Sequence, residues 1–120
     1  MEVGNIFRHL LIHNEAFVKN AEETKFLAYA THQNPYITLL TCADSRVQGE
    51  ILGKDIFNKV FIIRNAGNQF AVNRGSIEYA LFVLNTPVML VLGHTDCGAV
   101  KFATHACVTQ SKEIIDLSKS

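Results

Sequence analysis

The chain has 120 residues, a length that fits one domain, and its 48% hydrophobic content excludes an intrinsically disordered protein. Charged residues make up only 18% of the chain, below the roughly 25% usual for soluble domains, which favours an oligomer that hides part of its surface. The formal net charge is zero and lysine and arginine form no run, so the composition argues against nucleic acid and anionic membranes as partners.

Two features of the sequence indicate the cellular compartment of the protein. No apolar stretch approaches the ~20 residues that span a bilayer, and the first residues lack the basic and apolar regions of a secretory signal. We therefore expect a cytoplasmic protein.

The cysteines are Cys42, Cys97 and Cys107, an odd number that does not suggest a disulfide framework. In a reducing compartment they would be metal ligands, nucleophiles or small buried residues, and Cys107 is predicted to be a buried structural cysteine.

The first part of the chain is predicted to be helical. Apolar residues recur at spacings near three and four over residues 5–32. We expect a break near His13 and Asn14, with Asn14 capping a second helix. The helical region should end at Asn34, because a residue before proline avoids the α conformation.

Three short apolar runs follow, rich in branched residues and continuous rather than alternating. They cover residues 36–40, 60–63 and 88–92. Such runs are typical of strands buried on both faces, as in a parallel sheet.

Helices are predicted around these strands. They comprise a short helix between the first two strands, a crossover helix over 76–84, and helices over 98–107 and 112–117. The alternation predicts an α/β fold with a small, mostly parallel β-sheet flanked by helices, as a single domain over residues 1–120.

Each predicted strand runs into a segment with reactive or charged side chains. Cys42 follows the first strand, Arg64 follows the second, and His94 and Cys97 follow the third. Ligands of open α/β sheets bind at the carboxyl ends of the strands, so we expect these groups to lie together.

Cys42, His94 and Cys97 offer two thiolates and one imidazole, a ligand set that suits Zn²⁺. Three protein ligands leave a fourth position open, which is the arrangement of a catalytic zinc site. The charges of the ion and two thiolates sum to zero, so a bound water could still ionise.

Asp44 and Arg46 bear on that fourth position. Asp44 as a fourth ligand would close the site, whereas a bidentate pair with Arg46 would hold the carboxylate off the metal and keep it ionised. Two other interpretations remain open: a structural site closed by Asp44, and two unrelated buried cysteines. A disulfide between Cys42 and Cys97 is disfavoured without a secretion signal.

These segments resemble the β-class carbonic anhydrase family, which carries Cys-x-Asp-x-Arg followed further along by His-x-x-Cys. The matching segments are residues 42–47 and 93–100, and residues 64–68 and 77–80 are also similar. The resemblance runs from about Asn14 to Lys101. It implies reversible hydration of carbon dioxide to bicarbonate and a proton, zinc bound by Cys42, His94 and Cys97, and a catalytic dyad of Asp44 and Arg46.

The resemblance also implies a substrate pocket. Gln33 falls where the family has a glutamine that donates its amide to a substrate oxygen. Phe61 and Tyr79 fall at positions lining a small apolar pocket, and Ala66 falls where a slightly larger residue is common. The family completes this pocket across a dimer interface. We therefore expect an obligate homodimer or higher homo-oligomer, with the N-terminal helices packing on the partner and the glutamine supplied by it.

The chain departs from the family in some places. Members are usually considerably longer, and Gly49 stands where proline is common. Two other functions therefore stay open: a related hydrolase of carbonyl sulfide or carbon disulfide, and a zinc-stabilised binding or regulatory module without catalysis.

Overall fold

The structure is a computed structural model that describes residues 1–105. The chain divides into two compact units, Met1–His32 and Gln33–Ser120. Cys107 and the helix predicted over residues 112–117 lie outside the described residues. The organisation of residues 1–120 as a single domain stays a prediction.

The first unit contains two helices, α1 (Val3–Asn20) and α2 (Glu23–Ala28). The predicted break at His13 and Asn14 is wrong, because α1 continues through both residues. No proline or glycine interrupts the chain there, and an asparagine in an exposed helix costs only a few tenths of a kcal/mol relative to alanine, roughly 0.7 at most. The helix ends instead at Asn20, because the next residue, Ala21, has an extended backbone.

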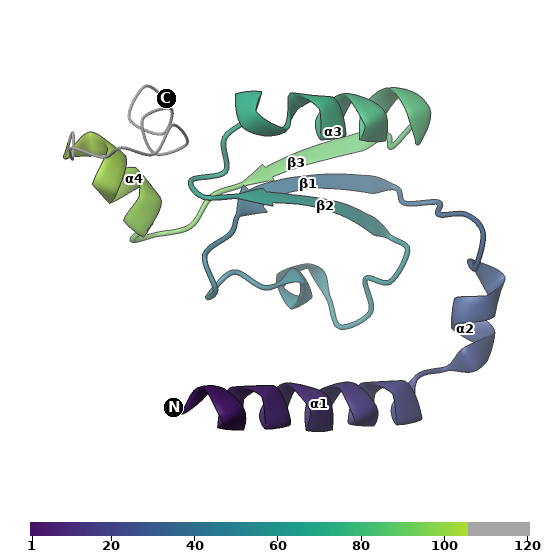
Figure 1. The fold of residues 1–120 in the computed structure, drawn as a ribbon. Helices are drawn as coiled ribbons and strands as arrows, with labels where there is room; N and C mark the ends of the chain where they lie inside the picture. Colours follow the sequence, from purple (N-terminus) through teal and green to yellow (C-terminus); the bar gives the residue numbers. More distant parts are fainter. Residues whose placement is uncertain (106–120) are drawn as a thin grey trace. The chain divides into compact units, whose positions relative to one another are not determined.

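The second unit is built on a parallel sheet, as predicted. Its strands are β1 (Ile37–Cys42), β2 (Val60–Asn65) and β3 (Val88–Leu92), in the order β2-β1-β3. All three arrows point the same way in Figure 1. Cys42 pairs with Asn65 and Thr41 pairs with Leu92, so the strands end at nearly the same level. This register places the segments that follow them at one edge.

Burial on both faces was predicted for all three strands but holds only for β1. Every residue of β1 from Thr38 to Cys42 is buried, whereas β2 has one buried residue and β3 has none. The cause is position, because β1 is the central strand and the other two are edges of the sheet within residues 1–105.

One face of the sheet packs against the crossover helix. This helix is α3 (Arg74–Glu78), continued by the π-helical turn η3 (Tyr79–Val83), and it lies along the sheet in Figure 1. Leu40, Ile63 and Ile77 form the buried cluster between them. Burial of apolar side chains at this face stabilises the unit and fixes the crossover on the sheet.

The segment between β1 and β2 contains the 3₁₀ turn η1 (Gly49–Leu52), which takes the place of the predicted short helix. Gly49 is tightly enclosed there, since a Cβ atom at this position would lie 2.6 Å from Ile56 Cδ1. The last described helix is α4 (Gly98–Thr104), which begins directly after Cys97.

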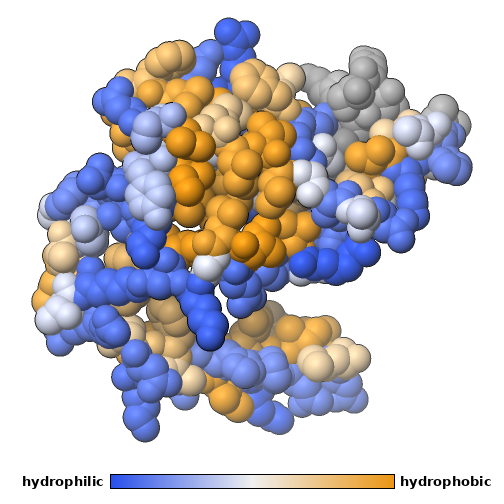
Figure 2. Space-filling model, turned by 180° about the vertical axis from the view of Figure 1, so that it is seen from behind, coloured by the Kyte–Doolittle hydropathy of each residue, from blue (hydrophilic) through white to orange (hydrophobic). Residues whose placement is uncertain are grey.

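The side of the molecule seen in Figure 2 carries a broad hydrophobic surface. Edge strand β3 and the preceding helical turn contribute exposed apolar side chains to the second unit. Phe82 is 74% exposed, Val83 62% and Val91 55%.

Candidate metal centre

Three potential metal ligands converge at the carboxyl edge of the sheet. Cys42 is the last residue of β1, and His94 and Cys97 lie in the loop between β3 and α4. Their ligand atoms all lie within 4.8 Å of one another, and the two sulfurs are 3.8 Å apart. That separation is far longer than a disulfide bond of about 2.05 Å, so both cysteines are free thiols.

The His94 ring is oriented to bind a metal through Nε2. Its Nδ1 lies 2.9 Å from the carbonyl oxygen of Thr95, which can only accept, so Nδ1 carries the proton. Nε2 is therefore the ring nitrogen that can offer a lone pair. Among the buried side-chain nitrogen and oxygen atoms of residues 1–105, it is the one that has no hydrogen-bond partner. A buried lone pair beside two thiols fits a zinc ion, because zinc takes both nitrogen and sulfur ligands.

The Cys42 thiol ionises more readily than an ordinary cysteine. Burial opposes ionisation, but the backbone N–H groups of Gly67 and Asp44, together with the neighbouring side chains of His94 and Cys97, outweigh burial and lower its pKa to about 7. The Gly67 nitrogen lies 3.3 Å from the sulfur, and its backbone has a φ of 82°, a conformation that favours glycine. The Cys42 side chain in turn raises the pKa of His94.

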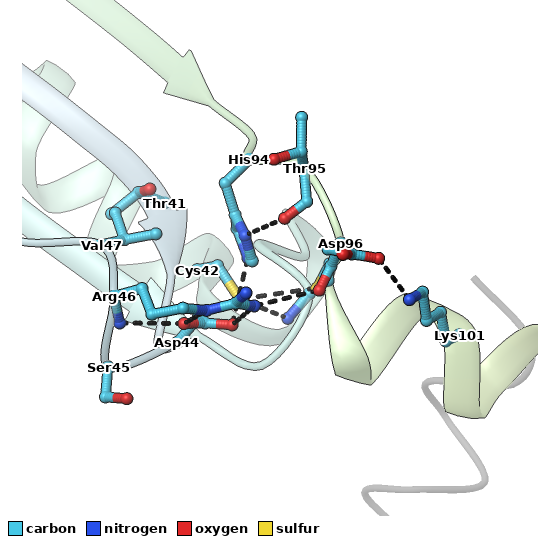
Figure 3. A network of polar contacts seen from close by, with 12 residues as sticks. Thr41, Cys42, Asp44, Ser45, Arg46, Val47, His94, Thr95, Asp96 and Lys101 are labelled. Atoms are coloured by element: carbon cyan, nitrogen blue, oxygen red, sulfur yellow. Dashed lines mark hydrogen bonds and ion pairs between the residues drawn. The ribbon is translucent and has the colours of Figure 1, made fainter.

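Asp44 is clamped by Arg46 in the bidentate arrangement that was predicted (Figure 3). Arg46 Nε donates to Asp44 Oδ1 at 2.9 Å and Nη2 donates to Oδ2 at 2.7 Å. The backbone N–H of Arg46 also donates to Oδ1. These bonds hold the pKa of the Asp44 carboxyl well below its usual range and raise the pKa of Arg46.

The clamp places Asp44 beside the metal ligands. Arg46 Nη2 also donates to the carbonyl oxygen of Asp96, which ties it to the loop that carries His94 and Cys97. Asp44 Oδ2 lies 3.7 Å from His94 Nε2. The carboxylate therefore faces the ligand cluster while its charge is balanced by Arg46, as the arrangement with an open fourth position requires.

A cleft of about 270 Å³ opens at this cluster. Its walls are formed by the two cysteine ligands, Asp44 and small residues, namely Cys42, Ala43, Asp44, Ala66, Cys97, Gly98 and Ala99. Small side chains leave room for a substrate of few atoms directly beside the thiols.

The structure separates the predicted pocket residues into two groups. Ala66 lines the cleft, whereas Phe61 and Tyr79 lie together, with ring centroids 5.9 Å apart, and do not line it. Phe61 pairs with Thr38 near the start of β1, and Gln33 precedes that strand. Three of the four predicted substrate contacts thus lie away from the metal ligands of their own chain.

Arg64 is a site residue that the sequence analysis did not assign. Its guanidinium donates to three carbonyl oxygens, those of Cys42 at 3.0 Å, Asp44 at 2.9 Å and Val47 at 2.5 Å. It therefore fixes the backbone of the loop that carries Cys42 and Asp44. The signals in the sequence were its charge next to a predicted buried strand and its place in the segment 64–68 that resembles the family, and neither indicated these contacts.

Comparisons with known proteins agree with this geometry. The carbonic anhydrase family model matches residues 37–118. Carbonic anhydrase 2 of Mycobacterium tuberculosis is 45% identical over 78 residues, which cover 64% of this chain and 38% of that protein. Among solved structures, the β-carbonic anhydrase CcaA superimposes with a TM-score of 0.81 at 28% identity, covering 94% of this chain and 61% of that one.

A tetrameric β-carbonic anhydrase of Sordaria macrospora is also similar, with a TM-score of 0.77 at 27% identity over 96% of this chain and 62% of that one. The chain spans less than half the length of the curated relatives it matches. No helix within residues 1–105 combines the length and the hydrophobicity needed to cross a bilayer. The matched sequence, the shared fold and the converging ligand set together show that the chain belongs to the β-class carbonic anhydrase family.

Proposed function

We propose that this chain holds a zinc ion through Cys42, His94 and Cys97 and catalyses the reversible hydration of carbon dioxide to bicarbonate and a proton. The observation that carries the proposal is the Asp44–Arg46 clamp beside the three ligand atoms. A purely structural zinc site has no use for a carboxylate that is held ionised next to the metal. Zinc would supply Lewis acidity that makes a water molecule more acidic near neutral pH.

Asp44 would orient the attacking water. Its Oδ1 accepts two hydrogen bonds from Arg46 and its Oδ2 accepts one, so Oδ2 keeps spare accepting capacity on the side nearest His94. The carboxylate can accept the proton of the attacking water in a hydrogen bond at Oδ2 and leave the oxygen lone pair directed at the substrate carbon. Arg46 keeps Asp44 ionised and prevents it from moving onto the metal.

The substrate pocket would be completed by a second copy of the chain. The residue steps of β1 span about 16 Å, so a glutamine before the strand cannot reach a metal site at its end. Gln33, Phe61 and Tyr79 would therefore serve the site of the partner subunit, with Gln33 binding a substrate oxygen. We accordingly propose a homodimer or a larger homo-oligomer. The exposed apolar surface of Figure 2 supports association.

The cytoplasm is the proposed compartment. The two thiols lie 3.8 Å apart and both are needed as metal ligands, so they must be kept from forming a disulfide. A reducing compartment meets that requirement.

The direct test is a stopped-flow carbon dioxide hydration assay on the zinc-loaded protein, with zinc quantified in every sample. We expect one zinc ion per chain and turnover in the wild type. Cys42→Ser should lose the metal, whereas Asp44→Asn should retain it and lower kcat by about 10²–10⁴-fold, because it removes a group that positions a proton. Glu50→Gln, the same type of change on exposed η1, is the matched control and should leave kcat unchanged.

Stoichiometric zinc without carbon dioxide hydration over a wide pH range would overturn the proposal. Turnover of carbonyl sulfide or carbon disulfide by that inactive protein would indicate the related hydrolase. No turnover of any of these gases would indicate a non-catalytic zinc module.

A further inference from the structure

A second cluster of metal-binding side chains lies on α1, in the other compact unit. His9 and His13 are one helical turn apart, and their Nε2 atoms are 2.9 Å from each other. The ring centroids are 4.3 Å apart and the rings are inclined by 60°. Both side chains are exposed to solvent. Residues at positions i and i+4 of a helix share one face, so both imidazoles can approach one ion.

The separation of the two nitrogens indicates the kind of ion. Imidazole nitrogens bind divalent metals at about 2.0–2.1 Å, so two of them in adjacent square-planar or octahedral positions lie about 2.9 Å apart. A tetrahedral ion would place them about 3.4 Å apart. The observed distance matches adjacent positions of an ion with right-angled coordination, and Ni²⁺ and Cu²⁺ prefer that geometry with nitrogen ligands.

We propose that His9 and His13 form a binding site for a divalent transition-metal ion, with water in its other positions. The site differs in chemistry from the Cys42, His94 and Cys97 cluster, because it offers two imidazoles and no thiolate. An imidazole-only site that is open to water favours Ni²⁺ or Cu²⁺ over Zn²⁺ in affinity. The competing arrangement is a simple hydrogen bond in which one ring donates to the other, and that arrangement needs no metal.

The metal would also brace the helix. α1 has no buried residue, so contacts inside the first unit do little to hold its turns in place. A metal ion that bridges successive turns fixes them directly. Bound metal should therefore slow amide hydrogen exchange around residues 9–13, and this readout does not depend on enzyme activity.

The test uses the zinc-loaded protein titrated with Ni²⁺ by calorimetry, with released zinc followed by a chromogenic chelator. We expect one additional Ni²⁺ per chain without zinc release. His9→Gln and His13→Gln should each weaken Ni²⁺ binding at least tenfold. His32→Gln is the matched control, because His32 is an exposed histidine of the same unit whose ring meets Tyr29 edge-on and does not contact another histidine ring in the described residues.

Protection of the α1 amides by Ni²⁺ should appear in the wild type and in His32→Gln, and it should be absent from the other two variants. Equal Ni²⁺ affinity in the double variant His9→Gln/His13→Gln would overturn the proposal. Nickel uptake matched by zinc release, or no nickel uptake at all, would overturn it as well.

Discussion

At the scale of single residues, Arg64 connects β2 to the loop that carries Cys42 and Asp44. Its three hydrogen bonds go to the carbonyl oxygens of Cys42, the last residue of β1, and of Asp44 and Val47 in the segment that follows. Arg64→Met keeps much of the side-chain length and removes all three donors. We expect zinc affinity to fall about 10–100-fold, the usual effect of losing a group that orients metal ligands. Chelator competition measures this change.

Two further variants show whether the hydrogen bonds of Arg64 cause the effect. Arg64→Lys should recover only part of the affinity, because one ammonium group cannot reproduce the planar set of guanidinium donors. Arg74→Met removes an exposed arginine that pairs with Glu78, and zinc affinity should be unchanged. Wild-type zinc affinity in Arg64→Met would show that the loop holds its shape without these bonds.

The sequence predicted the metal ligands because cysteine and histidine at the ends of buried strands have few other uses. In this way we predicted that Cys42, His94 and Cys97 lie close together and that Asp44 pairs with Arg46. The structure shows both arrangements. Arg64 and Gly67 could not be predicted to contact Cys42, because both contacts depend on the register between β1 and β2. Nothing in the local sequence of either residue encodes that register.

At the scale of elements, a buried hydroxyl pair connects β1 to the turn that leads into β3. Thr38 Oγ1 and Thr86 Oγ1 lie 2.5 Å apart, and Thr86 Oγ1 is also 3.3 Å from the carbonyl oxygen of Ala80. Thr86→Val leaves the Thr38 hydroxyl buried without this partner. We expect the free energy of unfolding to fall by about 1–3 kcal/mol, the cost of a buried polar group that loses its hydrogen bond.

The double variant distinguishes this cause from a packing defect. Thr38→Val should cost less than Thr86→Val, because Thr86 can still donate to Ala80. Adding Thr38→Val to Thr86→Val should restore stability, since no hydroxyl then remains unpaired. Urea unfolding of the wild type, the two single variants and the double variant gives the coupling free energy between the two hydroxyl groups. Exposed Thr104→Val serves as a control, and strictly additive single effects would contradict the expected coupling.

The apolar runs predicted the positions of the strands but not all of their ends. β3 lies where it was predicted, whereas β1 continues through Thr41 to Cys42 and β2 continues through Arg64 to Asn65. Polar residues at these ends interrupt the apolar pattern, and backbone pairing with the neighbouring strand extends the strands regardless. The π-helical turn at Tyr79–Val83 was also missed, because residues that form it read as an ordinary apolar helix.

At the scale of the whole molecule, the metal ligands and the predicted substrate-binding glutamine lie apart within one chain. Cys42 ends β1 and Gln33 precedes it, so one chain presents its metal ligands and its predicted glutamine at opposite ends of the same strand. In a twofold dimer each subunit gives and receives the same contacts. A homodimer could therefore contain two complete sites, each with metal ligands from one subunit and Gln33 from the other.

Mixing two inactive variants tests this arrangement. Gln33→Ala retains its metal ligands, and Cys42→Ser retains its glutamine, so each homodimer lacks one half of every site. Chains unfolded and refolded together in equal amounts with zinc should form hybrid dimers, in which one of the two sites is complete. Since half of the dimers are hybrids, carbon dioxide hydration should recover to about a quarter of the wild-type rate. Light scattering confirms that the mixture is dimeric. Activity equal to the mean of the two separate variants, in a mixture that has formed dimers, would show that Gln33 does not act on the partner's site.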